Sequence, residues 1–163
     1  MLTIPWIVAV VTSAILVDMA WMSAVVTNTL TNKTIRQWYQ EFGLGAVLTD
    51  VMSSSVCILL VSVWLPVKPT LESILRFCSV AVGFQVVHDL SLYEFSKLEY
   101  SSRIMNLFKA YGEENGASIL LADASIIVST FLLALALQTI PYPLLVLLLL
   151  TSLYILPYLL YSI

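Results

Sequence analysis

The sequence predicts an all-α integral membrane protein with about five transmembrane helices, the first four of which form two parallel helical-hairpin repeats. Composition carries the membrane assignment. Of the 163 residues, 60% are apolar and only 10% are charged, whereas soluble domains have about 45–50% apolar and about 25% charged residues. The mean hydropathy of +0.97 agrees with this assignment. The whole chain, residues 1–163, is expected to be one membrane domain.

A membrane-spanning helix needs about 20 mainly apolar residues, and five stretches of the chain qualify. They cover residues of about 4–29, 44–65, 71–95, 116–139 and 144–163. Prolines mark the turns, with Pro66 and Pro69 after the second stretch and Pro141 and Pro143 before the fifth. The fifth stretch is rich in leucine and carries no charge. We expect it to face lipid and to kink at Pro157.

Two polar connections, residues 31–42 and 96–115, are predicted to lie at the membrane surface. Apolar residues recur at helical spacing within 104–111, which indicates a helix in the interface. The first connection is also amphipathic. Trp38 and Tyr39, just beyond the first span, are interpreted as aromatic anchors at the membrane–water boundary.

The distribution of lysine and arginine predicts the orientation. The connections after the first and third spans share one side of the membrane and hold Lys33, Arg36, Lys97, Arg103 and Lys109. The opposite side holds only Lys68 and Arg76. Because cytoplasmic loops are enriched in positive residues, we expect the first side to be cytoplasmic. This places the N-terminus outside the cytoplasm and the C-terminus in it.

Four aspartates interrupt the predicted spans: Asp18, Asp50, Asp89 and Asp123. An ionised carboxylate at the centre of a membrane helix costs roughly 2.5–3.5 kcal/mol on insertion scales. Asp50 and Asp123 lie about seven residues inside their helices, which at about 1.5 Å per residue places them roughly 10 Å deep. We therefore predict that all four share a polar chamber in the cytoplasmic half of the membrane.

The spacing around these aspartates predicts an internal repeat. Residues 39–50 read YQEFGLGAVLTD and residues 111–123 read YGEENGASILLAD. Both segments have a tyrosine, a glutamate two residues later, a Gly-Ala pair and a final aspartate. We interpret residues of about 4–66 and 71–140 as two copies of one hairpin, with an additional helix at about 144–163. An even number of spans in each copy makes the repeat parallel.

Three interpretations of the aspartates remain open. They could form a cation or proton site, because gathered carboxylates bind protons or hard cations such as Mg²⁺ and Ca²⁺, with His88 as a further titrating neighbour. They could instead hold helices together through hydrogen bonds. The candidate supporting residues are Trp21, Ser53, Ser54, Tyr93 and Ser125. Asp50 and Asp123 could also be the N-caps of shorter helices.

Other residues are interpreted structurally. Cys57 and Cys78 are expected to be buried thiols that pack as small apolar groups. Small residues are expected to allow close helix packing; these are Gly43, Gly45, Ala46, Gly116 and Ala117.

Several classes of function are disfavoured. The sequence has no nucleophile elbow and no phosphate loop, so we expect neither an enzyme nor a cofactor, with a lipid-acting enzyme as a distant alternative. Seven lysines and arginines without a basic face make no nucleic-acid footprint.

Two groups of residues resemble known families. Residues 17–21 (VDMAW) and 88–90 (HDL) resemble a small bacterial membrane family of unknown function. The stretch 88–93, with 108–111 (FKAY) and further matches at Glu114, Gly116-Ala117 and Asp123-Ala124-Ser125, resembles a membrane protein that recurs in large DNA viruses of algae and protists. The resemblance covers residues of about 12–135.

The viral resemblance implies a structural or organising component of a virion internal membrane or host endomembrane. Its partners would be the lipid bilayer, capsid or other membrane proteins, and further copies of the chain. The aspartate cluster itself supports an alternative, a small cation or proton channel or transporter.

Overall fold

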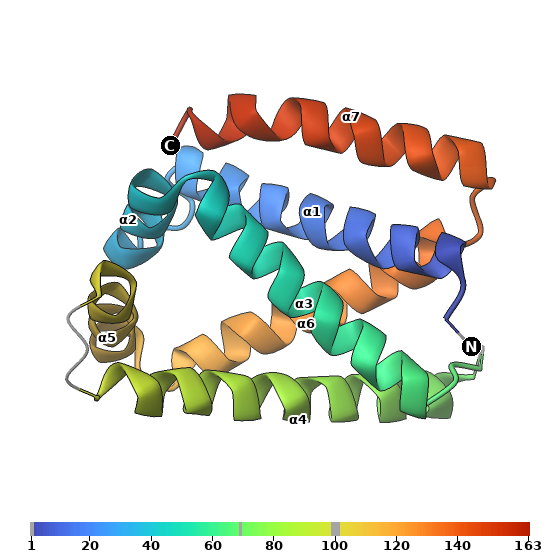
Figure 1. Cartoon of the computed structure of the whole chain (residues 1–163), viewed down its shortest axis with the longest axis horizontal. Helices are drawn as coiled ribbons and strands as arrows, with labels where there is room; N and C mark the ends of the chain where they lie inside the picture. The colour runs from blue at the N-terminus through green and yellow to red at the C-terminus, as the bar shows by residue number, and fades with distance from the viewer. Residues whose placement is uncertain (1, 69, 99–101) are drawn as a thin grey trace.

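Helices account for all the regular structure that the computed structural model describes, which covers residues 2–68, 70–98 and 102–163 (Figure 1). Five helices are long and apolar enough to cross a membrane: α1 (Ile4–Val26), α3 (Leu44–Trp64), α4 (Leu71–Ser96), α6 (Ser118–Leu137) and α7 (Tyr142–Leu160). Two shorter helices, α2 (Lys33–Phe42) and α5 (Arg103–Asn115), occupy the predicted surface connections. The all-α class with five long apolar helices is confirmed for these ranges. Pro69, predicted to lie in a turn, is outside the described residues.

Local chemistry explains where the helices differ from the predicted limits. α1 ends three residues earlier than expected, because Asn28 takes a φ of 55° and the Leu30 amide turns back to donate to the Ala24 carbonyl at 2.9 Å. α7 begins two residues earlier than expected. Its first turn accommodates Pro143, because the first amides of a helix need no intrahelical acceptor.

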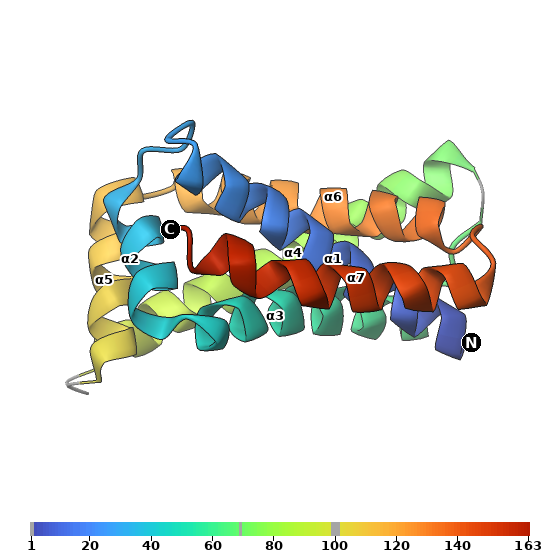
Figure 2. The same cartoon turned by 90° about the horizontal axis from the view of Figure 1, so that it is seen from above.

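Four long helices surround the centre of the molecule. α1 and α4 lie on opposite sides, and α3 and α6 run diagonally between them (Figure 1). α7 packs mainly against the outer side of α1. The two short helices lie together across one end, where the C-terminus also lies, and the N-terminus is at the other end (Figure 2). The short helices therefore close one end of the four-helix arrangement.

One cluster of the apolar core lies at the end away from α2 and α5. There Phe77 of α4 stacks on Phe131 of α6 with ring centroids 4.0 Å apart, and Trp6 of α1 meets Phe131 edge-on at 6.4 Å. These contacts join three of the long helices. Toward the α2–α5 end, a second apolar cluster that includes Met22, Val47 and Leu107 joins α1, α3 and α5.

Two glycines set the corners between short and long helices. Gly43 links α2 to α3 with a φ of 51° and ψ of −126°, and Gly116 follows α5 with a φ of 53° and ψ of −135°. This backbone region is accessible essentially only to glycine. The prediction of close packing is wrong for both, and also for Gly45, because a Cβ at any of the three would meet nothing within 4 Å. Ala46 is buried, whereas Ala117 is exposed.

Candidate functional site

The four aspartates of the predicted spans come together around one cavity of about 170 Å³. α1, α3, α4 and α6 each contribute one aspartate, and α2 and α5 contribute Trp38, Tyr39 and Tyr111 to its wall. We call this cavity the carboxylate pocket and define it by Asp18, Asp50, Asp89 and Asp123. No two of these aspartates are close in sequence, so the fold alone assembles the pocket.

Asp18 has a hydrogen-bond partner from a distant helix. The Tyr39 hydroxyl donates to Oδ1 of Asp18 at 2.7 Å, and both residues are buried, with 7% and 5% exposure. Among the described residues, Oδ2 of Asp18 meets no donor. Trp21 lines the pocket, but Tyr39 and not Trp21 is the partner. Burial raises the pKa of the Tyr39 hydroxyl well above its usual range, and the carboxylates of Asp18 and Asp50 add to the effect.

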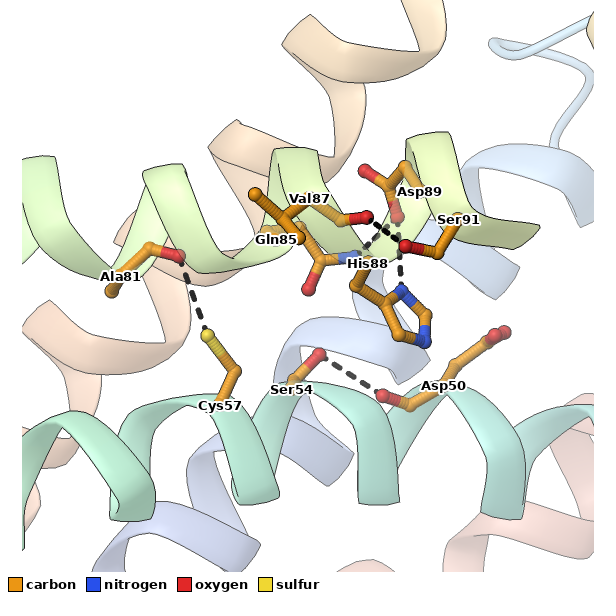
Figure 3. Close-up of polar contacts among 9 residues, drawn as sticks. All are labelled: Asp50, Ser54, Cys57, Ala81, Gln85, Val87, His88, Asp89 and Ser91. Atoms are coloured by element: carbon orange, nitrogen blue, oxygen red, sulfur yellow. Dashed lines mark hydrogen bonds and ion pairs between the residues drawn. The ribbon is translucent and has the colours of Figure 1, made fainter. Parts of the chain in front are cut away.

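Asp50 also has a hydrogen-bond partner in α2. The indole Nε1 of Trp38 donates to Oδ2 of Asp50 at 2.9 Å. Ser54, a predicted partner, donates at 3.0 Å to the backbone carbonyl of Asp50 and not to its carboxylate (Figure 3). Ser53 only lines the pocket wall. The N-cap interpretation is wrong for Asp50, because α3 is capped at Gly43 and Asp50 lies well inside the helix.

Asp89 finds its partners on its own helix. The Gln85 amide donates to Oδ1 of Asp89 at 2.7 Å, and Nδ1 of His88 lies 3.2 Å from the same oxygen (Figure 3). The other oxygen is buried and meets no donor among the described residues. Tyr93, the predicted partner, is exposed and instead carries the Lys97 ammonium 4.2 Å from its ring centroid.

Asp123 completes the pocket from α6. It lies inside that helix, whose N-cap is Ala117, so the N-cap interpretation is wrong here as well. The Ser125 hydroxyl donates to the Ala122 carbonyl at 2.6 Å and is therefore engaged elsewhere. Tyr111 of α5 also lines the pocket. Burial raises its pKa, and the neighbouring carboxylates, with Asp123 first among them, raise it further.

Trp38 and Tyr39 correct the prediction of interfacial anchors. Both are buried, at 9% and 5% exposure, and both point into the pocket as hydrogen-bond donors. One sequence pattern indicated this role for Tyr39. It precedes Asp50 by 11 residues, just as Tyr111 precedes Asp123 by 12. Gln85 was missed altogether, although its spacing of four residues from Asp89 places both on one helix face.

The pocket wall is rich in carboxyl groups and poor in basic side chains. Within the part of the chain that the structure describes, no lysine or arginine lines it, and His88 is the one basic side chain in the wall. Over the same residues, no three histidine, cysteine, aspartate or glutamate side chains are grouped so as to hold a metal ion. The geometry therefore does not favour a Mg²⁺ or Ca²⁺ centre.

Five long apolar helices around a buried acidic pocket are compatible with a multi-pass membrane protein. Comparison with protein-family models, with curated proteins and with solved structures finds no match to this chain. The function must therefore be argued from the pocket itself.

Proposed function

We propose that this is a small multi-pass membrane protein that conducts or transports protons or cations through the carboxylate pocket. One observation carries the proposal: four aspartates from four long helices line a single cavity whose described wall has no lysine or arginine. A carboxylate that only holds helices together needs donors on both oxygens. Here one oxygen of Asp18 and one of Asp89 have no hydrogen-bond donor among the described residues.

The chemistry of membranes supports this function. Ionisable side chains inside spanning helices are costly, and they typically mark ion pathways or proton relays. His88, whose side chain is 46% exposed, bonds to Asp89 at 3.2 Å and offers a proton acceptor at the rim of the pocket. A relay would thus run from His88 through Asp89 to the inner carboxylates.

The orientation and the repeat belong to the same proposal. The α2–α5 end faces the cytoplasm, which the excess of lysine and arginine on that side supports. The hairpins at about 4–66 and 71–140 are parallel copies. Support comes from the order Asp18–Tyr39–Asp50, which recurs as Asp89–Tyr111–Asp123. The matching backbone conformations of the two corner glycines support it as well.

Ion and proton flux in proteoliposomes tests the proposal. Wild-type protein should carry a flux that depends on pH between 5 and 8, and Asp50→Asn/Asp123→Asn should abolish it. Glu72→Gln is the matched control, because Glu72 is an exposed carboxylate in the first turn of α4, outside the pocket. Equal flux in the double variant and the control would reject the proposal.

A second candidate is a structural component of a viral internal membrane. The resemblance to viral membrane proteins supports it, and so do the exposed charged side chains at the α2–α5 end, among them Lys33 and Lys109, which capsid or other membrane proteins could contact. Such a component should keep its location and partners after all four aspartates are changed to asparagine. Loss of assembly in those variants, with folding intact, would count against it.

A further inference from the structure

We propose that the carboxylate pocket binds a primary or secondary organic ammonium ion with a ring-sized apolar body, which reaches the pocket from the bilayer between α3 and α4. This inference rests on the proposed function, because it names the cation that the same pocket takes. Four features of the pocket carry it: acceptors without donors, aspartates not grouped as metal ligands in the described residues, an aromatic wall and a lateral mouth.

The first feature is a set of buried acceptors that lack donors. Asp18 is only 7% exposed and lines the pocket, yet no described residue donates to its Oδ2. One oxygen of Asp89 likewise has no described donor, and the neighbouring carboxylate of Asp123 is itself an acceptor when ionised. A buried acceptor without a donor costs about 1–3 kcal/mol. An ammonium ion with N–H groups would supply both the missing donors and the missing positive charge.

The second feature is that the aspartates are not grouped as metal ligands among the described residues. Three of the four accept from different donors: Asp18 from Tyr39, Asp50 from Trp38 and Asp89 from Gln85. A calcium ion needs about 6–8 oxygens at about 2.3–2.6 Å, and no such grouping exists in the described residues. A larger cation, with its charge spread over several donors, suits this arrangement.

The third feature is an apolar and aromatic wall. Trp21, Trp38, Phe108, Tyr111, Leu92 and Ile126 all line the pocket. Aromatic faces attract organic cations more than they attract well-hydrated metal ions. The volume of about 170 Å³ is close to that of an engineered cavity of about 150 Å³ that holds benzene. The pocket therefore has room for one ring-sized apolar group beside the charged nitrogen.

The fourth feature is the position of the mouth. Two lining residues are exposed, Thr49 of α3 and His88 of α4, so the pocket opens between these helices. Figure 3 shows the His88 ring in the space between α3 and α4. The neighbours Leu48 and Val87 are apolar and exposed, as expected for a surface that faces lipid. At the end of the bundle, α2 and α5 cover the pocket instead (Figure 1).

Benzylammonium is a suitable probe, because it joins one primary ammonium to one benzene ring. We expect it to quench or shift the tryptophan fluorescence of the full-length protein in lipid nanodiscs at saturable concentrations. Benzyl alcohol, which keeps the ring and loses the charge, should bind at least tenfold more weakly. Benzyltrimethylammonium, which keeps the charge and loses the N–H donors, should also bind more weakly than benzylammonium.

Variants locate the binding site. Asp18→Asn/Asp89→Asn should weaken benzylammonium binding at least tenfold, whereas the exposed control Glu72→Gln should leave it unchanged. Should the double variant fold poorly, Thr49→Trp gives an independent test. This change fills the mouth and should slow association at least tenfold relative to Thr139→Trp, which alters an exposed threonine just beyond the C-terminal end of α6.

Several outcomes would overturn the inference. Unchanged affinity in the folded Asp18→Asn/Asp89→Asn protein would place the amine elsewhere, and equal association rates for the two tryptophan variants would reject the α3–α4 route. Saturable Mg²⁺ binding that excludes benzylammonium would assign the pocket to a metal. Proton flux without amine binding would reject the ligand but keep the proposed function. The absence of both flux and binding would reject the two together.

Discussion

Replacing Tyr39 by phenylalanine removes one hydroxyl and little else. That hydroxyl donates to Oδ1 of Asp18 at 2.7 Å, and the other oxygen of Asp18 already lacks a donor among the described residues. The change therefore leaves the Asp18 carboxylate without any donor from these residues. An unsatisfied buried acceptor costs about 1–3 kcal/mol, while side-chain hydrogen bonds within membranes average about 0.6 and reach about 1.7 kcal/mol. Because the whole carboxylate is affected, we expect a loss near the upper membrane value, about 1.5 kcal/mol.

Reversible unfolding in mixed detergent micelles, followed by circular dichroism, measures this loss. Tyr161→Phe is the matched control, since Tyr161 is 79% exposed and its change should have little effect on the free energy of unfolding. Combining Tyr39→Phe with Asp18→Asn gives a double-mutant cycle, in which the two changes should be non-additive. A Tyr39→Phe protein as stable as the Tyr161→Phe protein would refute the assigned role of this hydrogen bond.

The raised pKa of Tyr39 also predicts how the stability of the protein changes at alkaline pH. The pKa of Tyr39 is raised by burial above the ordinary value of 10.0, so the hydroxyl stays protonated in the folded protein after it would ionise in the unfolded chain. The stabilisation is therefore complete below pH 10 and declines as the pH rises from there toward the folded pKa. Tyr39→Phe should weaken this alkaline decline, and a decline of unchanged size would contradict the argument.

Three further changes test the local structure. Gly43→Ala should destabilise the protein by about 1–3 kcal/mol, because Gly43 has a positive φ. Gly83→Ala should instead stabilise it by about 0.5–1 kcal/mol, because Gly83 lies within α4 where an added Cβ meets no other atom. Equal effects of the two changes would contradict the role of Gly43 at the corner between α2 and α3. Ser102→Ala should cost about 1 kcal/mol, measured by thermal unfolding, because Ser102 caps α5, and no loss would show that the cap is dispensable. Hydrogen bonds from Thr34 lower the pKa of Glu114, so the stability lost in Glu114→Gln should be present at neutral pH and vanish as the pH falls through the folded pKa. A difference that persists in acid would contradict this assignment.

The sequence predicted the five long apolar helices well because their signal is local. Hydropathy over about 20 residues identifies a membrane helix without any tertiary information, and an aspartate inside such a stretch must find a polar interior. The pocket assembled from Asp18, Asp50, Asp89 and Asp123 follows that logic.

The partners of the aspartates were harder to predict, because two of them come from another element. Tyr39 is 21 residues from Asp18, and Trp38 is 12 residues from Asp50. Local spacing suggested side chains one turn away, such as Ser54, whose hydroxyl is taken by a backbone carbonyl of its own helix. The direction of α2 depends on the backbone conformation of Gly43, where the chain turns into α3. Composition does not predict that conformation.

The most direct test of the central claim measures stability and flux on one protein, Asp50→Asn/Asp123→Asn. If the carboxylates form a functional site, the double variant should be at least as stable as the wild type, because asparagine removes the cost of burying two ionisable groups. It should also carry no proton or cation flux. A double variant that loses stability and keeps the wild-type flux would contradict the account and assign the aspartates to helix packing.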